Sequence, residues 1–236
     1  MSLALLRWEV AGPYDVVFST RVGGVSEGPF ESLNLGRRTG DEVERVDENR
    51  RRLCAEVDAD EPSLTLGFQT HSTVVNRAEA GSRGIPGDSL WTDEAGVPML
   101  TLGADCALMA MARTNGAKPA LAVIHAGWRG LIDGVVETTA DVIGPGFAAV
   151  VGPAIGPCCY EVGEEVASRF RARFGDDIVT DGKLDLWTAA ERAARDAGAA
   201  EVERVDLCTR CRSDLFFSER RTGRPRGTQG VLGVVR

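Results

Sequence analysis

Histidine is scarce in this sequence: among 236 residues only His71 and His125 are present. This scarcity excludes any site that needs many imidazoles. Long apolar runs are also missing, and the one near the N-terminus, residues 3–6, is far shorter than a signal-peptide core or a membrane span. We therefore expect a cytoplasmic protein without a membrane partner.

An excess of positive charge is lacking as well, since the formal net charge is −8. Nucleic acids and membrane surfaces attract proteins through basic patches, so neither is expected as a partner. An anionic substrate would have to be bound by a local group of arginines. The sequence identifies no protein partner.

Several catalytic fingerprints are absent. The sequence contains no GxxxxGK[ST] or GxGxxG segment, which excludes the P-loop and the dinucleotide fingerprint. It also contains neither the HxE…PCxxC pattern of zinc base deaminases nor a GxSxG nucleophile elbow.

The composition is that of an ordinary globular protein, with 43% hydrophobic and 26% charged residues. The length and the lack of a linker or repeat favour one domain over residues 1–236. A chain of this size buries a core without a metal or disulfide staple, so a bound metal is expected to serve function rather than folding.

Apolar runs and helical periodicity alternate irregularly, which predicts an α/β (α+β) fold with mixed β-sheets and flanking helices. Helices are expected over Asp41–Val57, with Asp41 as the N-cap, and over three later segments: Leu131–Ile143, Glu161–Phe174, and Asp185–Ala197 with Asp185 as the cap. Strands are expected over Val16–Thr20, Thr73–Val75, Pro98–Leu102, Ala120–Ile124, Ala148–Val151, Val202–Leu207 and Val231–Val235.

Three potential metal ligands lie at or near the ends of apolar runs. His71 stands in GFQTHSTVV, Cys106 follows PMLTLGAD, and His125 ends ALAVIH, with separations of 35 and 19 residues. These separations are too wide for a zinc finger but suit a site that the fold assembles, with three protein ligands and an open fourth position. Asp105, beside Cys106, is a candidate base or hydrogen-bond acceptor for that site.

Candidate anion-binding groups occur in three segments. HAGWRG places Arg129 and two glycines at the start of a helix, where backbone N–H groups and the helix dipole favour phosphate. FSTRVGGVSEGPFESLNLG contains Arg21 and Asn34, and an arginine there can contact phosphate with two hydrogen bonds. The basic segment FFSERRTGRPRG is an exposed surface in its simplest interpretation, or a strap over an anionic ligand.

Four cysteines remain outside the predicted metal site. Cys208 and Cys211 form a single CxxC, which is a weak metal signal without a second pair. A four-thiolate site with Cys158 and Cys159 is conceivable, but adjacent cysteines chelate awkwardly, so a structural or redox-silent role is favoured. The loop GPAIGPCCYE also carries Tyr160, which we expect to line a pocket.

Six ordered blocks together resemble the YfiH or laccase-domain family, whose members are described as polyphenol oxidases and as purine nucleoside phosphorylases. The resemblance runs from about Phe18 to the C-terminus. The sequence departs from the family pattern in three places. Arg37 and Arg38 occupy the stretch where members usually carry a histidine, and Ala107 follows the ADC block in place of proline. The arginine of the final block is displaced, with RGTQG at residues 226–230. The blocks are FSTRVGGVSEGPFESLNLG, QTHSTVV, DSLWTDEAGVPMLTLGADC, HAGWRG, VGPAIGPCCYEVGEEV and CTRCRSDLFFSERRTG.

The resemblance implies zinc bound by His71, Cys106 and His125. It also implies phosphorolysis of adenosine, inosine and S-methyl-5'-thioadenosine with inorganic phosphate, and some adenosine deamination. On this hypothesis Arg21 and Arg129 bind phosphate and Asp105 carries the proton. The substrate-binding residues are Asn34, Gln69 and Tyr160.

Three alternatives stay open at this stage. A single Cu²⁺ at the same His2Cys site, with Met109 or Met111 as the axial ligand, would give a laccase-like polyphenol oxidase. A multicopper laccase is rejected, because two histidines cannot supply its copper centres. Cys106 and His125 without metal would form a nucleophile pair, and a module that binds purine nucleotides without turnover is the non-enzymatic alternative.

Overall fold

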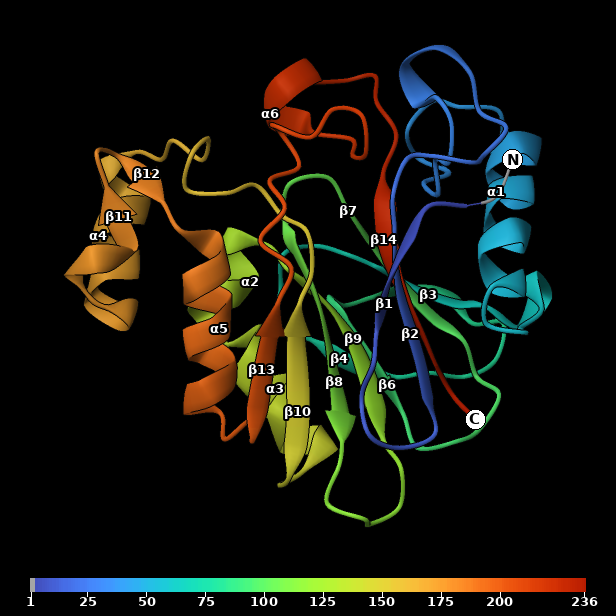
Figure 1. The fold of residues 1–236 in the computed structure, drawn as a ribbon, viewed down its shortest axis with the longest axis horizontal. Coiled ribbons are helices and arrows are strands. Elements are labelled where there is room, and N and C mark those ends of the chain that lie inside the picture. The colour runs from blue at the N-terminus through green and yellow to red at the C-terminus, as the bar shows by residue number, and fades with distance from the viewer. Residues whose placement is uncertain (1–2) are drawn as a thin grey trace.

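The computed structural model describes residues 3–236. Two six-stranded sheets lie face to face, and helices cover their outer faces (Figure 1). The first sheet has the order β1-β2-β14-β7-β3-β5 and the second the order β13-β10-β8-β9-β6-β4. Parallel pairs, such as β10 with β13 and β3 with β7, lie beside antiparallel ones, so the expected mixed sheets and flanking helices are confirmed.

The strands of the first sheet are β1 (Leu5–Trp8), β2 (Tyr14–Ser19), β14 (Gln229–Val235), β7 (Met99–Gly103), β3 (Thr65–Phe68) and β5 (Arg83–Pro86). Those of the second are β13 (Glu201–Arg204), β10 (Phe147–Val151), β8 (Ala107–Arg113), β9 (Leu121–Ala126), β6 (Ser89–Thr92) and β4 (Val75–Arg77). A separate two-stranded ribbon joins β11 (Val179–Thr180) to β12 (Lys183–Leu184).

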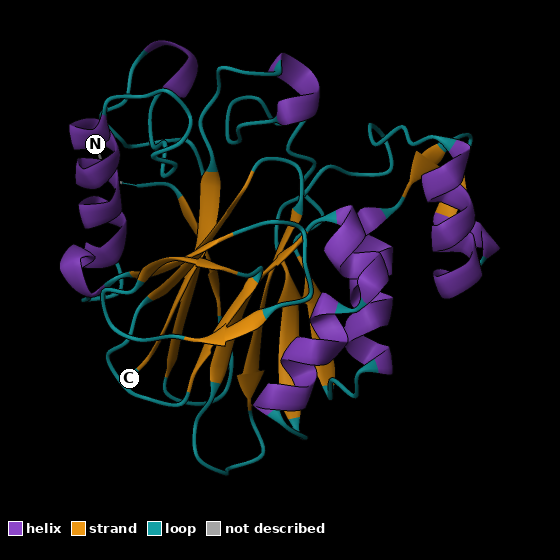
Figure 2. Cartoon of the chain, turned by 180° about the vertical axis from the view of Figure 1, so that it is seen from behind, coloured by secondary structure: helices purple, strands orange, loops and turns teal. Residues whose placement is uncertain are grey.

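The α-helices are α1 (Val43–Ala55), α2 (Trp128–Asp133), α3 (Val135–Ile143), α4 (Glu164–Phe174), α5 (Leu186–Asp196) and α6 (Glu219–Thr222). α1 lies against the first sheet, whereas α2, α3 and α5 lie on the opposite side of the molecule against the second (Figures 1 and 2). No helix within residues 3–236 is both long and apolar enough to cross a membrane.

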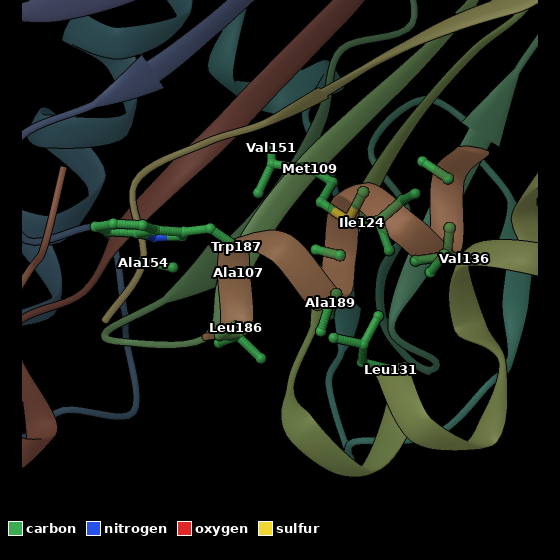
Figure 3. Close-up of a cluster of buried hydrophobic side chains, with 14 of the residues drawn as sticks. Ala107, Met109, Ile124, Leu131, Val136, Val151, Ala154, Leu186, Trp187 and Ala189 are labelled. Carbon is green, nitrogen blue, oxygen red and sulfur yellow. The ribbon is translucent and has the colours of Figure 1, made fainter. Parts of the chain in front are cut away.

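Three apolar clusters fill the spaces between these layers. One lies between the two sheets, a second lies between α1 and the first sheet, and the third packs helices on the second sheet. In the third, Met109 and Ile124 of neighbouring strands lie close to Ala189 of α5 and Val136 of α3 (Figure 3). Because β8 is covered on both faces, every residue from Ala107 to Ala112 is buried.

The structure corrects several sequence predictions. The helix expected over Leu131–Ile143 is two helices, because Gly134 has a φ of 103° and turns the chain between α2 and α3. Asp41 is not the cap of α1: the N-cap is Glu42, and the Asp41 carboxylate accepts from Asn34 instead. Asp185 does cap α5, accepting from the Thr188 N–H.

Seven strands were not expected: the two-residue strands β11 and β12, and five others whose local sequences explain why. β8 has the sequence ALMAMAR, whose alanines and methionines favour a helix in isolation. Its burial between β9 and β10 decides its conformation, because the backbone groups must pair with those neighbours. β5 lies within the glycine-rich stretch that reads as a loop, and β1, β3 and β6 are only four residues long.

Candidate metal centre

His71, Cys106 and His125 come together in the folded chain. One ligand atom from each lies within 4.8 Å of the others, as the sequence predicts. The Cys106 Sγ lies 3.6 Å from His71 Nε2, and the two imidazole rings meet edge to face with their centroids 5.0 Å apart. Two imidazoles and a thiolate at these distances form a donor set that fits zinc with an open position.

Strand pairing positions two of the three ligands. His125 is the penultimate residue of β9, and it pairs with Leu108 of the neighbouring strand β8. Cys106 immediately precedes β8, so the register places it next to the end of β9. His71 follows β3 in a loop, where its φ of 60° is unusual for a residue with a side chain. The fold therefore gathers ligands from both sheets.

The carboxylate of Asp88 holds both histidines in place, and it was not among the predicted site residues. Its Oδ1 lies 2.8 Å from His125 Nδ1 and accepts the His71 backbone N–H at 3.0 Å. Its Oδ2 accepts the backbone N–H groups of Thr70 and Ser72 at 3.0 and 2.7 Å. A hydrogen bond on Nδ1 leaves His125 Nε2 free to bind metal, which is a common arrangement around metal-bound histidines.

The glycines of HAGWRG make room for the His71 loop. A Cβ built on Gly127 would lie 2.1 Å from His71 Cδ2, and one on Gly130 would lie 2.9 Å from the Ser72 carbonyl oxygen. Only glycine therefore allows this close approach. α2, which begins directly after Gly127, has six residues.

The free ligands already favour the ionised thiol. Burial alone would raise the pKa of Cys106, but the charge of His125 and hydrogen bonds with both imidazoles lower the pKa to about 6. Burial would lower the pKa of His125, but Cys106 and Asp88 raise it to about 9. A thiolate and an imidazolium thus face each other, and a divalent cation would replace the imidazolium proton between them.

Beside the three ligands lies a cavity of about 560 Å³, a size typical of small-molecule sites. Six arginines line it, and none of its described lining residues carries a carboxylate, although the whole chain is acidic. Its apolar part includes Leu66, Phe68 and Leu102. The arginines are Arg37, Arg38, Arg50, Arg83, Arg224 and Arg226.

These arginines differ in whether their guanidinium groups already pair with a carboxylate. Arg38 is exposed and stacks on the Phe68 ring, with its Cζ 4.0 Å from the centroid. Arg226 pairs with Glu219 at 2.6 Å, and Arg37 and Arg83 also have carboxylate partners. Burial lowers the pKa of Arg50 to about 10. Arg224 is also exposed and lies 3.9 Å from the Glu219 carboxylate. Arg38 and Arg224 are therefore the two arginines most available for a ligand.

The three predicted catalytic residues lie outside the lining of the cavity. Asp105 is buried next to Cys106, where its carboxylate accepts from the Thr209 hydroxyl at 2.6 Å and the Arg220 N–H at 2.7 Å. Arg21 donates to the carbonyl oxygens of Glu31 and Ser213. Arg129 is exposed and stacks on its neighbour Trp128.

The three predicted substrate-binding residues lie in different surroundings. Gln69 lines the cavity, and its amide oxygen accepts the Leu102 N–H at 2.9 Å. Asn34 is fully buried and accepts the N–H groups of Gly36 and Thr228, two residues that line the cavity. Tyr160 is not among the lining residues of this cavity, and its ring lies under the Arg220 guanidinium, whose Cζ is 5.0 Å from the ring centroid.

The sequence signals for the missed residues were weak. Asp88 directly precedes a short strand in GDSLW, and nothing local shows that its carboxylate faces a histidine 37 residues away. Arg50 and Arg83 lie in a helix and in a glycine-rich stretch, with no anion motif around them. Arg224 and Arg226, in contrast, belong to the basic segment FFSERRTGRPRG, for which the sequence predicts either an exposed surface or a strap over an anionic ligand.

The positions of Met109 and Met111 decide whether the His2Cys group can form a blue-copper site. A blue-copper site adds a weak axial methionine to two histidines and a cysteine. Met109 and Met111 are completely buried in the cluster between the second sheet and its helices, where Figure 3 shows Met109 beside Ile124. Three residues of extended chain also separate Met109 from Cys106, which corresponds to about 10 Å. Neither methionine therefore completes a copper site.

Comparison with known proteins identifies the family of this chain. Residues 15–235 match the family described as multi-copper polyphenol oxidoreductase laccase. A Pseudomonas aeruginosa protein named purine nucleoside phosphorylase is 35% identical over 228 residues, covering 92% of each chain. The Escherichia coli protein named purine nucleoside phosphorylase YfiH is 33% identical over 222 residues, covering 87% of this chain and 89% of that protein.

Two solved structures share the fold. A crystal structure of a Neisseria meningitidis protein superimposes with a TM-score of 0.87 at 31% identity and covers 100% of this chain and 99% of that one. The structure of YlmD from Geobacillus stearothermophilus has a TM-score of 0.86 at 29% identity, covering 95% of this chain and 92% of that one. This chain therefore belongs to the YfiH or laccase-domain family.

Proposed function

We propose that this protein is a zinc-dependent purine nucleoside phosphorylase that acts on adenosine, inosine and S-methyl-5'-thioadenosine. The products would be the free base and ribose 1-phosphate, or its methylthio analogue. Relatives at 33–35% identity carry the name of this activity. The observation on which the proposal rests is the His2Cys group beside a cavity lined by six arginines.

The lining of the cavity combines apolar and positively charged groups that suit the two reactants. Phe68, 40% exposed at the cavity, and Leu66 supply an apolar surface for a purine ring. Arg38 and the arginines of the C-terminal segment supply the positive charge that a phosphate dianion needs. Phosphate held there would attack the anomeric carbon as the base leaves, and correct placement of the two reactants lowers the barrier.

The residues of the metal centre fit zinc in an open site. Zinc bound by His71, Cys106 and His125 supplies Lewis acidity at the edge of the cavity. The same position suits the adenosine deamination that we propose as a side activity. Asp105 remains our candidate proton carrier. Arg21 and Arg129, expected as phosphate ligands, lie outside the cavity lining, so the proposal gives phosphate binding to the arginines of the cavity.

Phosphate dependence tests the proposal. Purified protein should release hypoxanthine from inosine with phosphate present, form ribose 1-phosphate in equal amount, and lose the reaction when phosphate is omitted. His71→Ala should abolish it. Equal rates for wild type and His71→Ala would remove the metal from the mechanism, and release of free ribose without phosphate would identify a hydrolase instead.

The copper alternative has its own measurement. A single copper in a His2Cys site gives an intense blue colour, so copper-loaded protein should be examined for that absorption and for oxidation of phenols. We expect zinc in the protein as purified and no blue colour. Phenol oxidation that follows copper content and is lost in Cys106→Ser would overturn the phosphorylase proposal in favour of an oxidase.

A further inference from the structure

A second cluster of metal-binding side chains lies apart from the His2Cys group. The Sγ atoms of Cys158, Cys159, Cys208 and Cys211 all lie within 4.8 Å of one another. The sequence named this four-thiolate set as conceivable but favoured a structural or redox-silent role, because adjacent cysteines chelate awkwardly. Residues 157–159 form a turn that directs both neighbouring side chains toward the CxxC pair.

The sheet brings the two cysteine pairs together. β10 and β13 are parallel neighbours, so the loops that follow them leave the sheet at the same edge. The two loops stay in contact beyond the strands, because Ala154 and Cys208 form a parallel bridge and the Thr209 N–H donates to the Ala154 carbonyl oxygen at 3.1 Å. The cluster is therefore built by the fold.

The distances between the sulfurs suit a tetrahedral metal better than a disulfide. Cys211 Sγ lies 3.6 Å from Cys158 Sγ and 3.4 Å from Cys159 Sγ. A disulfide bond needs about 2.05 Å between sulfurs. A tetrahedron of thiolates around zinc, with Zn–S bonds of about 2.3 Å, has edges of about 3.8 Å. All four cysteines are free thiols in this arrangement.

Backbone groups around Cys208 support a thiolate. The Gly156 N–H donates to Cys208 Sγ at 3.3 Å. The Arg221 guanidinium donates to the carbonyl oxygens of Thr209 and Arg210, the two residues between the CxxC cysteines. A cation next to this loop offsets part of the negative charge of a tetrathiolate site.

We propose that Cys158, Cys159, Cys208 and Cys211 bind a second zinc ion, in a closed tetrathiolate site that fastens the loop after β10 to the loop after β13. Four thiolates leave no open position, so this zinc is structural. The proposal is independent of the activity assigned to the His2Cys group.

This second site is linked to the first through two short connections. The residue after Cys208, Thr209, donates its hydroxyl to Asp105, which is adjacent to the metal ligand Cys106. The residue after Cys159, Tyr160, contacts Arg220, whose backbone N–H also donates to Asp105. The tetrathiolate zinc therefore fixes the segments that hold Asp105, and Asp105 and Tyr160 are expected to become mobile without it.

Zinc counting by native mass spectrometry tests the site in the intact protein. Wild-type chain expressed with zinc should carry two ions. Cys158→Ser/Cys211→Ser, which changes the two exposed ligands, and His71→Ala should each carry one, from different sites. Cys54→Ala, a cysteine buried elsewhere, should keep two. A single zinc in wild type that survives in Cys158→Ser/Cys211→Ser would overturn the proposal.

Cobalt spectra give a second test that does not depend on how well the double variant folds. His71→Ala loaded with Co²⁺ should show the strong visible bands and sulfur charge-transfer absorption of a tetrahedral tetrathiolate site. Absence of these bands, iron in place of zinc at the four cysteines, or a disulfide among them in protein kept under reducing conditions would each contradict the inference.

Discussion

The Asp88 carboxylate lies 2.8 Å from His125 Nδ1 while the same carboxylate accepts the backbone N–H groups of three consecutive residues, 70–72. One buried side chain thus fixes the orientation of one metal ligand and the loop conformation of another. These hydrogen bonds outweigh the cost of burial and hold the pKa of Asp88 well below its usual range. The carboxylate is therefore charged at any pH where the metal binds.

Replacing this carboxylate should weaken the metal centre more than the fold. We expect Asp88→Asn to lower zinc affinity about 10–100-fold, because the amide lacks the charge that raises the basicity of His125 and turns its ring. Competition with a chromophoric chelator measures this affinity. Asp141→Asn on the exposed side of α3 is the control, and an unchanged affinity in Asp88→Asn would contradict the role given to the carboxylate.

A methyl group at position 127 should displace a metal ligand. A Cβ there would lie 2.1 Å from His71 Cδ2, so Gly127→Ala forces the imidazole to move. A displacement of about 1 Å can reduce turnover roughly 100-fold. Gly163→Ala is the matched control, because nothing lies within 4 Å of its Cβ position. Zinc content and phosphorolysis should fall in the first variant and stay unchanged in the second.

Arg38 should contribute to phosphate binding more than to the chemical step. It lines the cavity, and no carboxylate partner for it occurs among residues 3–236. We expect Arg38→Ala to raise the KM for phosphate about tenfold, which corresponds to about 1.4 kcal/mol, with a smaller effect on kcat. Arg171→Ala on α4 serves as the control. A phosphate KM equal to that of wild type would remove Arg38 from the anion site.

Metal removal should expose a reactive thiolate. In metal-free protein, Cys106 alkylation by iodoacetamide should rise with pH and reach half its maximum near the pKa of about 6, since the thiolate is the nucleophile. Burial raises the pKa of Cys54 to about 12, so that thiol should remain unmodified. Peptide mass spectrometry separates the sites.

Zinc should protect Cys106 in the same experiment. If Cys106 is alkylated as fast in zinc-loaded protein as after chelation, the thiol is free and the metal-independent nucleophile pair becomes the better hypothesis. A midpoint near the ordinary thiol pKa of 9.0 would contradict the electrostatic pairing of Cys106 with His125.

Local sequence was sufficient for elements whose signals are short-range. The apolar runs at β2, β7, β9, β10 and β14 and the periodic segments at α1, α4 and α5 predicted elements close to those observed. Local sequence was insufficient for β8, because its alanine-rich sequence favours a helix. Its conformation as a strand depends on pairing with β9 and β10. The helical periodicity of residues 131–143 likewise did not reveal the break at Gly134, whose φ of 103° ends α2.

The sequence by itself determined the candidate metal ligands. With two histidines in the chain, and one cysteine between them at the end of an apolar run, few other sets of imidazole and thiolate ligands were available. Only the tertiary structure decided which groups surround them. Asp88, the six arginines and the four clustered cysteines come from distant segments. Strand pairing and sheet packing set their distances, and no local pattern in a single sequence records such contacts.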